Sequence, residues 1–240
     1  RYNGRDYSCS NYQRSRFTKD MDNCKIDSLK NALVEVRKAH RLVYSYQERM
    51  LSLVNFIKAH LDGNRFSGVK HFSEPIKKKA GSEELTLPPG MWAWDYLYSY
   101  LFEYYIYEET LDDDSSIMLS VVQYADTGFF DSKADNKLDI TEFIEPEKSI
   151  SKLMFIMEHT PKGKKPVWQN WADLRSYIEN KKYASAKHKS DVIYPNGEGK
   201  TRLLLYSVPL EQFADERSSI EALKGYLSFL KKEGIELELV

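Results

Sequence analysis

The sequence predicts an α+β protein, in which a long N-terminal helical hairpin precedes a mixed or antiparallel sheet with two or three helices. A seven-residue apolar repeat begins near residue 26, and short β-branched and apolar runs fill the second half. Helices first and strands later is an order typical of this class. We expect three parts: a polar arm over 1–24, a helical hairpin over 25–110 with a long basic linker at 63–90, and an α+β domain over 111–240.

The repeat predicts one uninterrupted helix with an apolar seam. Apolar positions recur at alternating spacings of three and four residues, the pattern of a coiled coil. The seam residues expected to form an interaction surface are Leu29, Leu33, Val36, His40, Val43, Gln47, Met50, Val54 and Ile57. From Ile26 to Leu61 such a helix forms a rod of roughly 54 Å. We interpret His40 as a core residue that sets the register, and Gly63 as the signal that ends the helix.

A second helix is predicted from Met91 to Glu109, in a segment dominated by aromatic residues. Strand alternation fits part of this segment, but Asp95, Ser99 and Glu103 lie four residues apart, which would place them on one polar stripe of a helix. This helix would return along the first one as an antiparallel hairpin.

The rest of the chain favours strands, with two further helices. Strands are expected at Ile117–Tyr124, Leu153–Glu158, Asp191–Tyr194, Arg202–Val208 and Ile235–Val240. The third and fourth flank a Pro-Asn-Gly turn typical of a β-hairpin. Helices are expected at Trp171–Lys181 and Ser218–Lys232.

Composition excludes several classes of protein. The chain has 240 residues, of which 42% are hydrophobic and 30% charged, with a net charge of −1. These values argue against a disordered chain and against a wholly basic nucleic-acid binder. No apolar run approaches the 18 or so residues that span a bilayer, so no membrane partner is expected. Cys9 and Cys24 suit a reduced, cytoplasmic protein, although a secreted protein with a disulfide between them stays open.

Charge is unevenly distributed despite the neutral total. Glu103 to Glu147 contains thirteen acidic and two basic residues. The basic excess lies elsewhere, partly in Arg65–Lys79 and Lys181–Arg202. Two faces of opposite sign would favour head-to-tail self-association, while solvated loops on different sides of the fold are the alternative.

One acidic segment resembles the calcium loop of the EF-hand family. Its acidic residues occupy the first, fifth, ninth and twelfth positions of a twelve-residue loop: Asp131, Asp135, Asp139 and Glu142. Oxygen ligands at these spacings could bind a divalent cation. Position three is Lys133 and position six is Asn136, where the family has a ligand and a glycine, and the preceding segment looks like a strand. An acidic turn without metal is the simpler interpretation, so no cofactor is expected.

A basic cluster, Lys77, Lys78 and Lys79, raises the question of anion or nucleic-acid contacts. Together with exposed aromatic rings it could follow a phosphate backbone. Rings at helical spacing are more often core residues, so nucleic acid is not the expected partner. Gly199-Lys200-Thr201 ends like a phosphate-binding loop, but the first glycine is missing and a strand follows, so a hairpin turn explains it better.

These features lead to one functional hypothesis and two alternatives. The chain is expected to be a non-enzymatic interaction or scaffolding module whose long helix binds another protein or a second copy of itself. A metal-dependent enzyme or sensor that uses the acidic residues of 126–142 is the first alternative. A nucleic-acid factor that uses the basic linker and the aromatic segment is the second. No catalytic set is recognisable in the sequence.

Overall fold

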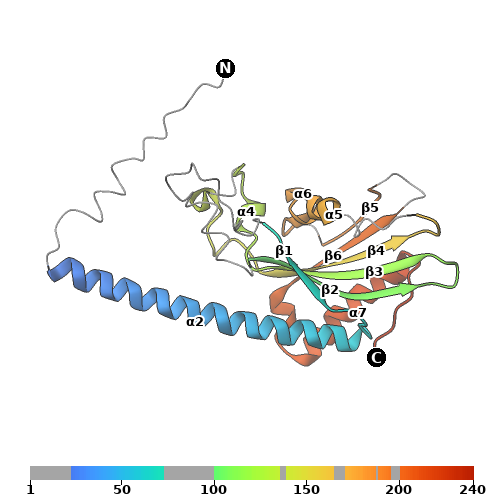
Figure 1. The fold of residues 1–240 in the computed structure, drawn as a ribbon, viewed down its shortest axis with the longest axis horizontal. Helices are drawn as coiled ribbons and strands as arrows, with labels where there is room; N and C mark the ends of the chain where they lie inside the picture. Colours follow the sequence, from blue (N-terminus) through green and yellow to red (C-terminus); the bar gives the residue numbers. More distant parts are fainter. Residues whose placement is uncertain (1–22, 73–99, 136–138, 165–170, 188, 196–200) are drawn as a thin grey trace, which may run out of the picture. The chain divides into compact units, whose positions relative to one another are not determined.

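A long helix and a six-stranded antiparallel sheet with a few helices make up the computed structural model, and they confirm the predicted α+β class (Figure 1). The structure describes residues 23–72, 100–135, 139–164, 171–187, 189–195 and 201–240. It divides into two compact units, Arg1–Met50 and Leu51–Val240. No helix within these described ranges is long and apolar enough to cross a membrane.

The predicted long helix is α2, Asn23–His60. All described residues of the first unit belong to it, and its last ten residues belong to the second. Asp62 ends it in the left-handed region with φ of 50°, and the Gly63 backbone N–H donates to the Lys58 carbonyl at 2.8 Å. The expected stop signal is therefore at the right place, but the left-handed residue is Asp62 and not the glycine after it.

The second unit is built on one antiparallel sheet with the strand order β1-β2-β3-β4-β6-β5. Neighbouring strands in this order pair antiparallel throughout. The strands are β1 (Ser67–Lys70), β2 (Leu101–Thr110), β3 (Ser116–Tyr124), β4 (Lys152–Thr160), β5 (Ser190–Ile193) and β6 (Arg202–Pro209).

Several helices complete this unit and cover both faces of the sheet. Figure 1 shows α4, α5 and α6 on one side and α7 on the other. The helices are α4 (Gly128–Asp131), α5 (Trp171–Ile178), α6 (Lys181–Ala184) and α7 (Glu216–Lys232), with short 3₁₀ turns η1 (Ile140–Glu142) and η2 (Leu210–Phe213).

Strand β4 shows why the central strands are almost continuously apolar. Met154 and Ile156 join the core on the side of α4 to α6. Phe155, between them, points to the other face, where its ring stacks on Tyr226 of α7 at 4.6 Å. Since successive side chains of a strand alternate between faces, a strand covered on both sides needs apolar residues at every position. A hydrophobic run without alternation is the sequence signal of such a strand.

The prediction of a second helix over 91–109 is wrong for residues 100–109, the part that the structure describes. Leu101–Thr110 is strand β2, paired with β1 on one side and β3 on the other, with a bulge between Tyr105 and Tyr107. Residues 91–99 lie outside the described ranges, and a helical hairpin is not confirmed. The four-residue polar spacing misled because Glu103 is buried within the sheet at 1% exposure and is not on a solvated helix face.

Two smaller expectations also need correction. The linker at 63–90 contains an edge strand, β1, while its part beyond Phe72 lies outside the described residues. The final segment, Ile235–Val240, forms no strand. Its alternating pattern has a different cause: Ile235 is buried at 3%, and the Val240 backbone N–H donates to the His60 carbonyl at 3.0 Å.

The remaining predicted elements are confirmed, with small shifts at their ends. Strands β3, β4, β5 and β6 lie where the apolar runs placed them, and β5 pairs with β6 as the hairpin signal required. The helix predicted at Trp171–Lys181 is divided into α5 and α6 by Asn180, whose side chain accepts a hydrogen bond from the Lys182 backbone N–H. Helix α7 matches the C-terminal amphipathic pattern.

A glycine after α7 allows a direct test of backbone strain. Gly234 has φ of +78°, and a Cβ built there would meet no atom within 4 Å, so a side chain would introduce strain without a clash. We expect Gly234→Ala to lower the free energy of unfolding by about 1 kcal/mol, and Gly234→Asn to lower it less, because Asn tolerates this region better. Urea unfolding measures both. Glu233→Ala, at an ordinary negative φ, is the control, and equal effects at both positions would contradict the explanation.

Candidate interaction surface and buried polar sites

The predicted seam of α2 is uncovered over its first half and covered over its second. Leu29, Leu33, Val36 and Val43 are 53%, 44%, 50% and 47% exposed. Further along the same two columns, Met50, Val54 and Ile57 are 2%, 0% and 0% exposed. Of the two polar seam residues, His40 is exposed and Gln47 is half-buried. One periodic pattern therefore gives a buried segment and a segment with apolar side chains in solvent.

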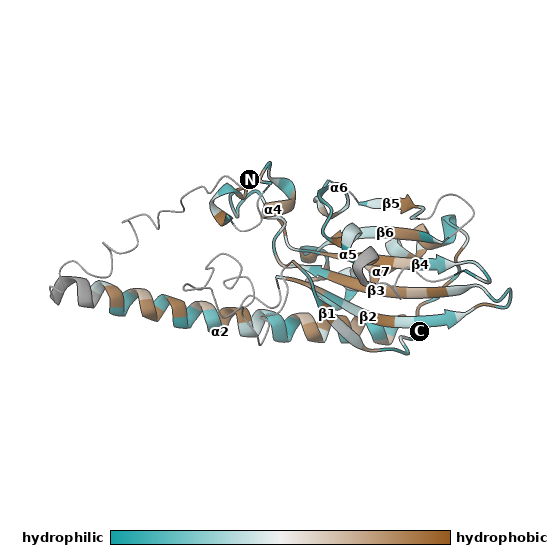
Figure 2. Ribbon diagram, turned by 45° about the horizontal axis from the view of Figure 1, so that its top comes forward, coloured by the Kyte–Doolittle hydropathy of each residue, from teal (hydrophilic) through white to brown (hydrophobic). Residues whose placement is uncertain are grey.

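Other apolar side chains of this half of α2 are exposed too: Tyr44 flanks the seam, whereas Val34 and Leu42 lie on the far side of the helix. Leu42 and Tyr44 are 71% and 69% exposed, and Val34 is 36% exposed. Figure 2 shows apolar residues recurring among polar ones along α2. Singly exposed apolar residues are ordinary on protein surfaces, but a contiguous row of them marks an interaction site.

The same segment is basic. Between Ser28 and Ser45 there are four basic residues and one acidic residue, a net charge of +3 with His neutral. The one acidic residue, Glu35, already accepts a bond of 2.8 Å from the Lys38 ammonium one turn away. Two of the cations, Lys30 and Arg37, follow directly after seam residues. The uncovered surface is therefore an apolar row with a basic margin on one side.

The predicted metal ligands do not come together. Within the described part of the chain, no group of three or more His, Cys, Asp and Glu side chains could hold a metal ion. Asp131 Oδ1 instead accepts bonds from the Ser185 hydroxyl at 2.7 Å and the Ala186 N–H at 3.0 Å. Asp139 caps η1 by accepting from Thr141, and Asp135 and Glu142 are exposed. The EF-hand-like spacing is not accompanied by the ligand geometry of that family.

Lys181 donates hydrogen bonds to two backbone carbonyl oxygens of this acidic turn. The Lys181 ammonium donates to the Ser132 carbonyl at 2.8 Å and the Ala134 carbonyl at 2.6 Å. It also lies 4.2 Å from the centre of the Phe129 ring. Burial lowers the pKa of Lys181, while Asp135 and Asp131 raise it. These contacts let a protein cation, with no metal ion, link α6 to the acidic turn.

The features proposed for nucleic-acid binding do not form a surface in the described residues. Lys77, Lys78 and Lys79 lie outside the described ranges. The tyrosines of β2 are within the sheet: Tyr104, Tyr105 and Tyr107 are 2%, 6% and 9% exposed. Base stacking needs exposed ring faces, and these rings offer none.

The structure contains a buried polar cluster that the sequence analysis did not predict. His71 Nε2 donates to Glu103 Oε2 at 2.8 Å, and the Ser120 hydroxyl donates to Glu103 Oε1 at 2.6 Å. All three residues are at most 3% exposed. His71 Nδ1 is buried and has no hydrogen-bond partner among the described residues. The only available signal was an acidic residue inside an aromatic run, and it was interpreted as a helical stripe.

Lys152 is a second buried charged residue that the sequence did not reveal. Its side chain is 1% exposed at the start of β4. The ammonium donates to the Ser185 carbonyl at 3.1 Å and the Ser207 hydroxyl at 3.2 Å, and lies 5.0 Å from the centre of the Tyr124 ring. Burial lowers the pKa of Lys152 to about 8, and the nearby Asp131 carboxylate opposes the change. The contacts hold the end of α6 to the sheet.

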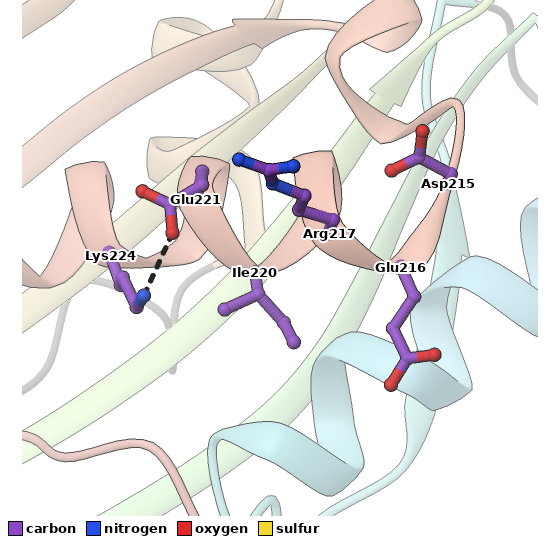
Figure 3. A pocket seen from close by; sticks show the side chains of 6 residues that line it. All are labelled: Asp215, Glu216, Arg217, Ile220, Glu221 and Lys224. Atoms are coloured by element: carbon purple, nitrogen blue, oxygen red, sulfur yellow. Dashed lines mark hydrogen bonds and ion pairs between the residues drawn. The ribbon is translucent and has the colours of Figure 1, made fainter.

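An open groove lies beside the first turns of α7, with a volume of about 550 Å³ (Figure 3). Its side chains are mostly charged, and two of them, Glu221 and Lys224, form an ion pair. Asp215 caps the helix by accepting from the Ser218 N–H, and these hydrogen bonds lower the pKa of Asp215. Glu221 accepts from the Lys224 ammonium at 2.8 Å. Helix capping and a surface ion pair explain this groove, and it contains no nucleophile next to a base.

Comparison with known proteins gives one match. A protein-family model with the description PM0109 matches residues 27–235, which include most of α2 and all six strands. No curated protein and no solved structure matches the chain.

Proposed function

We propose that the chain, which belongs to the PM0109 family, is a non-enzymatic protein-interaction module that binds an amphipathic partner helix along the first half of α2. The supporting observation is the abrupt change in exposure along one seam, from about half exposed at Leu29–Val43 to nearly zero at Met50–Ile57. The same two heptad positions are apolar in both halves of α2. The sequence pattern of the first half is therefore as suited to burial as that of the second.

The energetics favour a partner for this segment. Complete burial of a Leu or Val side chain contributes about 1.5–3 kcal/mol, so covering the exposed half of each contributes roughly 1 kcal/mol. Four such residues on each of two helices give a total comparable to the cost of association, which is about 4–15 kcal/mol. Because the two quantities nearly cancel, these contacts alone give a weak, reversible complex.

A photo-cross-linking experiment tests this function without knowledge of the partner. A photoreactive amino acid is introduced at Val36 or Val43, on the seam, or at Lys38 or Ser45, on the opposite side of α2. The full chain is then irradiated in cells that naturally produce it. We expect cross-linked products of higher mass from the two seam positions, and little from the two control positions.

One outcome of the photo-cross-linking experiment would contradict the proposed function. If neither seam position gives products above the level of the control positions, the seam has no partner in the cell and the proposed function is wrong. Circular dichroism of the purified variants shows whether each has kept its helix, so that unfolding cannot be mistaken for lost binding.

A further inference from the structure

We propose that the helix bound by the uncovered seam belongs to a different protein and carries acidic residues along one margin, where they pair with Lys30, Arg37 and Arg41. This inference rests on the proposed function and names the chemistry of the partner. The argument uses only the exposure and charge of side chains in the first unit, whose described residues all belong to α2.

The basic residues that flank the uncovered seam lie beside one margin of it. Lys30 and Arg37 each follow a seam residue directly, and Arg41 comes one turn after Arg37. With 3.6 residues in each turn of a helix, these three side chains project on the same side of α2. The opposite margin is uncharged, with small residues at Ala32 and Ala39. A partner that matches this surface therefore needs charges of one sign along one margin only.

Arg37 and Arg41 have no acidic neighbour along α2. Side chains meet on a helix surface at spacings of three and four residues, and no residue at these spacings from either arginine is acidic. Within the part of the chain that the structure describes, neither guanidinium takes part in an ion pair or a hydrogen bond. The two arginines are themselves four residues apart, a like-charge spacing that weakens a helix slightly. A carboxylate supplied by a partner would replace this repulsion with attraction.

The basic margin lies at the positions that select partners in coiled coils. Residues that flank an apolar seam form salt bridges between helices and decide which helices pair. Lys30 and Arg37 occupy such positions one heptad apart, directly after Leu29 and Val36, which are 53% and 50% exposed. A partner helix with Asp or Glu at two flanking positions one heptad apart would cover the apolar seam and pair with these cations in the same geometry.

Charge and composition disfavour two other occupants of the seam. A second copy of the chain would bring together two segments that each have a net charge of +3, and like charges across an interface are unfavourable. An anionic membrane attracts cations too, but helices that lie in a membrane interface carry a face rich in Trp, Phe and Leu. Between Ser28 and Ser45 there is no Trp or Phe, and His40 interrupts the seam. An acidic partner helix suits both the charge and the narrow seam.

Charge reversal at two neighbouring positions tests this inference in cells. The photoreactive amino acid is placed at Val43, and the full chain carries either Arg37→Glu, on the basic margin, or Lys38→Glu, on the outer side of α2. Both native side chains are exposed, and both substitutions change the charge by the same amount. We expect Arg37→Glu to reduce the cross-linked products about fivefold, because attraction to the partner becomes repulsion, and Lys38→Glu to leave them nearly unchanged. Circular dichroism shows whether each variant keeps its helix.

Synthetic helices of known charge supply the second measurement on the purified full chain. Two fluorescent peptides share one apolar seam and carry either Glu or Lys at flanking positions one heptad apart, and each is used at a concentration at which it is monomeric. By fluorescence anisotropy we expect the native chain to bind the Glu peptide about tenfold more tightly than the Lys peptide, with a smaller difference at high salt. Arg37→Glu should lose most of this preference and Lys38→Glu should keep it. Co-sedimentation with vesicles of phosphatidylcholine and phosphatidylserine should show no binding.

Several outcomes would overturn the acidic partner helix. They are equal effects of Arg37→Glu and Lys38→Glu on cross-linking, equal affinity of the native chain for the two peptides, and binding to the anionic vesicles without binding to the Glu peptide. If the native chain still gives cross-linked products from Val36 and Val43 in these cases, the seam has a partner of different chemistry and only this inference fails. If the native chain gives no such products, the proposed function itself is wrong.

Discussion

Replacement of Glu103 by alanine is expected to lower the free energy of unfolding by about 3–5 kcal/mol, because it leaves two buried donors without an acceptor and each costs about 1–3 kcal/mol. Its carboxylate is the shared acceptor of the buried cluster, 2.8 Å from His71 Nε2 and 2.6 Å from the Ser120 hydroxyl. Without it, both donors stay buried with no acceptor. His71 Nδ1 already has no hydrogen-bond partner among the described residues, so the imidazole would also lose the bond that its Nε2 donates to Glu103.

Urea unfolding followed by far-UV circular dichroism measures this effect. Glu147→Ala removes a carboxylate from an exposed position and is the matched control, with an expected change within about 0.5 kcal/mol. The triple variant His71→Leu/Glu103→Leu/Ser120→Ala removes all three polar groups, and should recover most of the loss, because buried polar groups are costly chiefly when they are left unpaired. A loss below 1 kcal/mol for Glu103→Ala, or a triple variant that is no more stable than it, would contradict this account.

The same glutamate explains why a helix was predicted where the structure has strand β2. Aromatic residues in β2 could be assigned to either a helix or a strand by their spacing, and the decision depended on treating Asp95, Ser99 and Glu103 as a solvated stripe. A buried carboxylate with two donors breaks the rule that polar residues mark the outer surface. Its partner His71 lies 32 residues earlier in the chain, so no local pattern could have revealed the pairing.

Most other elements were predictable because their signals are local. The apolar runs of β3 and β4 reflect cover on both faces, and the period of α7 reflects cover on one side. The C-terminal residues show the limit of such reasoning. Alternation at Ile235–Val240 specifies which side chains are buried, but a strand also needs a neighbouring strand with free backbone groups, and the sequence does not state whether one is present.

The candidate sites divide in the same way. The heptad pattern located the seam of α2, but it could not tell that burial begins at Met50, since the residues on both sides of this point have the same period. The acidic spacing at Asp131–Glu142 suggested a metal site. In the described structure Asp131 accepts hydrogen bonds from Ser185 and Ala186, and the Lys181 ammonium binds the carbonyl oxygens of Ser132 and Ala134. The burial of Lys152 could not be predicted. The local sequence of a strand does not show that a helix distant in the chain covers a lysine at its start.

Burial of Lys152 should give the protein a specific dependence of stability on pH. The pKa of this ammonium is lowered from 10.5 to about 8 in the folded chain, mainly by burial. Between these two values the unfolded chain retains the proton and the folded chain does not, so the free energy of unfolding must rise with pH. The penalty for the buried charge is fully present at pH 7 and decreases as the pH passes 8.

We expect the native chain to gain about 2 kcal/mol of stability from this group between pH 7 and pH 9.5. Lys152→Met keeps the length of the side chain and removes the charge, so it should lack this gain. The difference between the two proteins isolates Lys152 from all other titrating groups, and stopping at pH 9.5 keeps the measurement below the raised pKa values of the buried tyrosines. Lys232→Met, at an exposed position, should follow the native curve. Parallel curves for the native chain and Lys152→Met would show that the ammonium keeps its proton when folded, and that its carbonyl and hydroxyl acceptors compensate for burial.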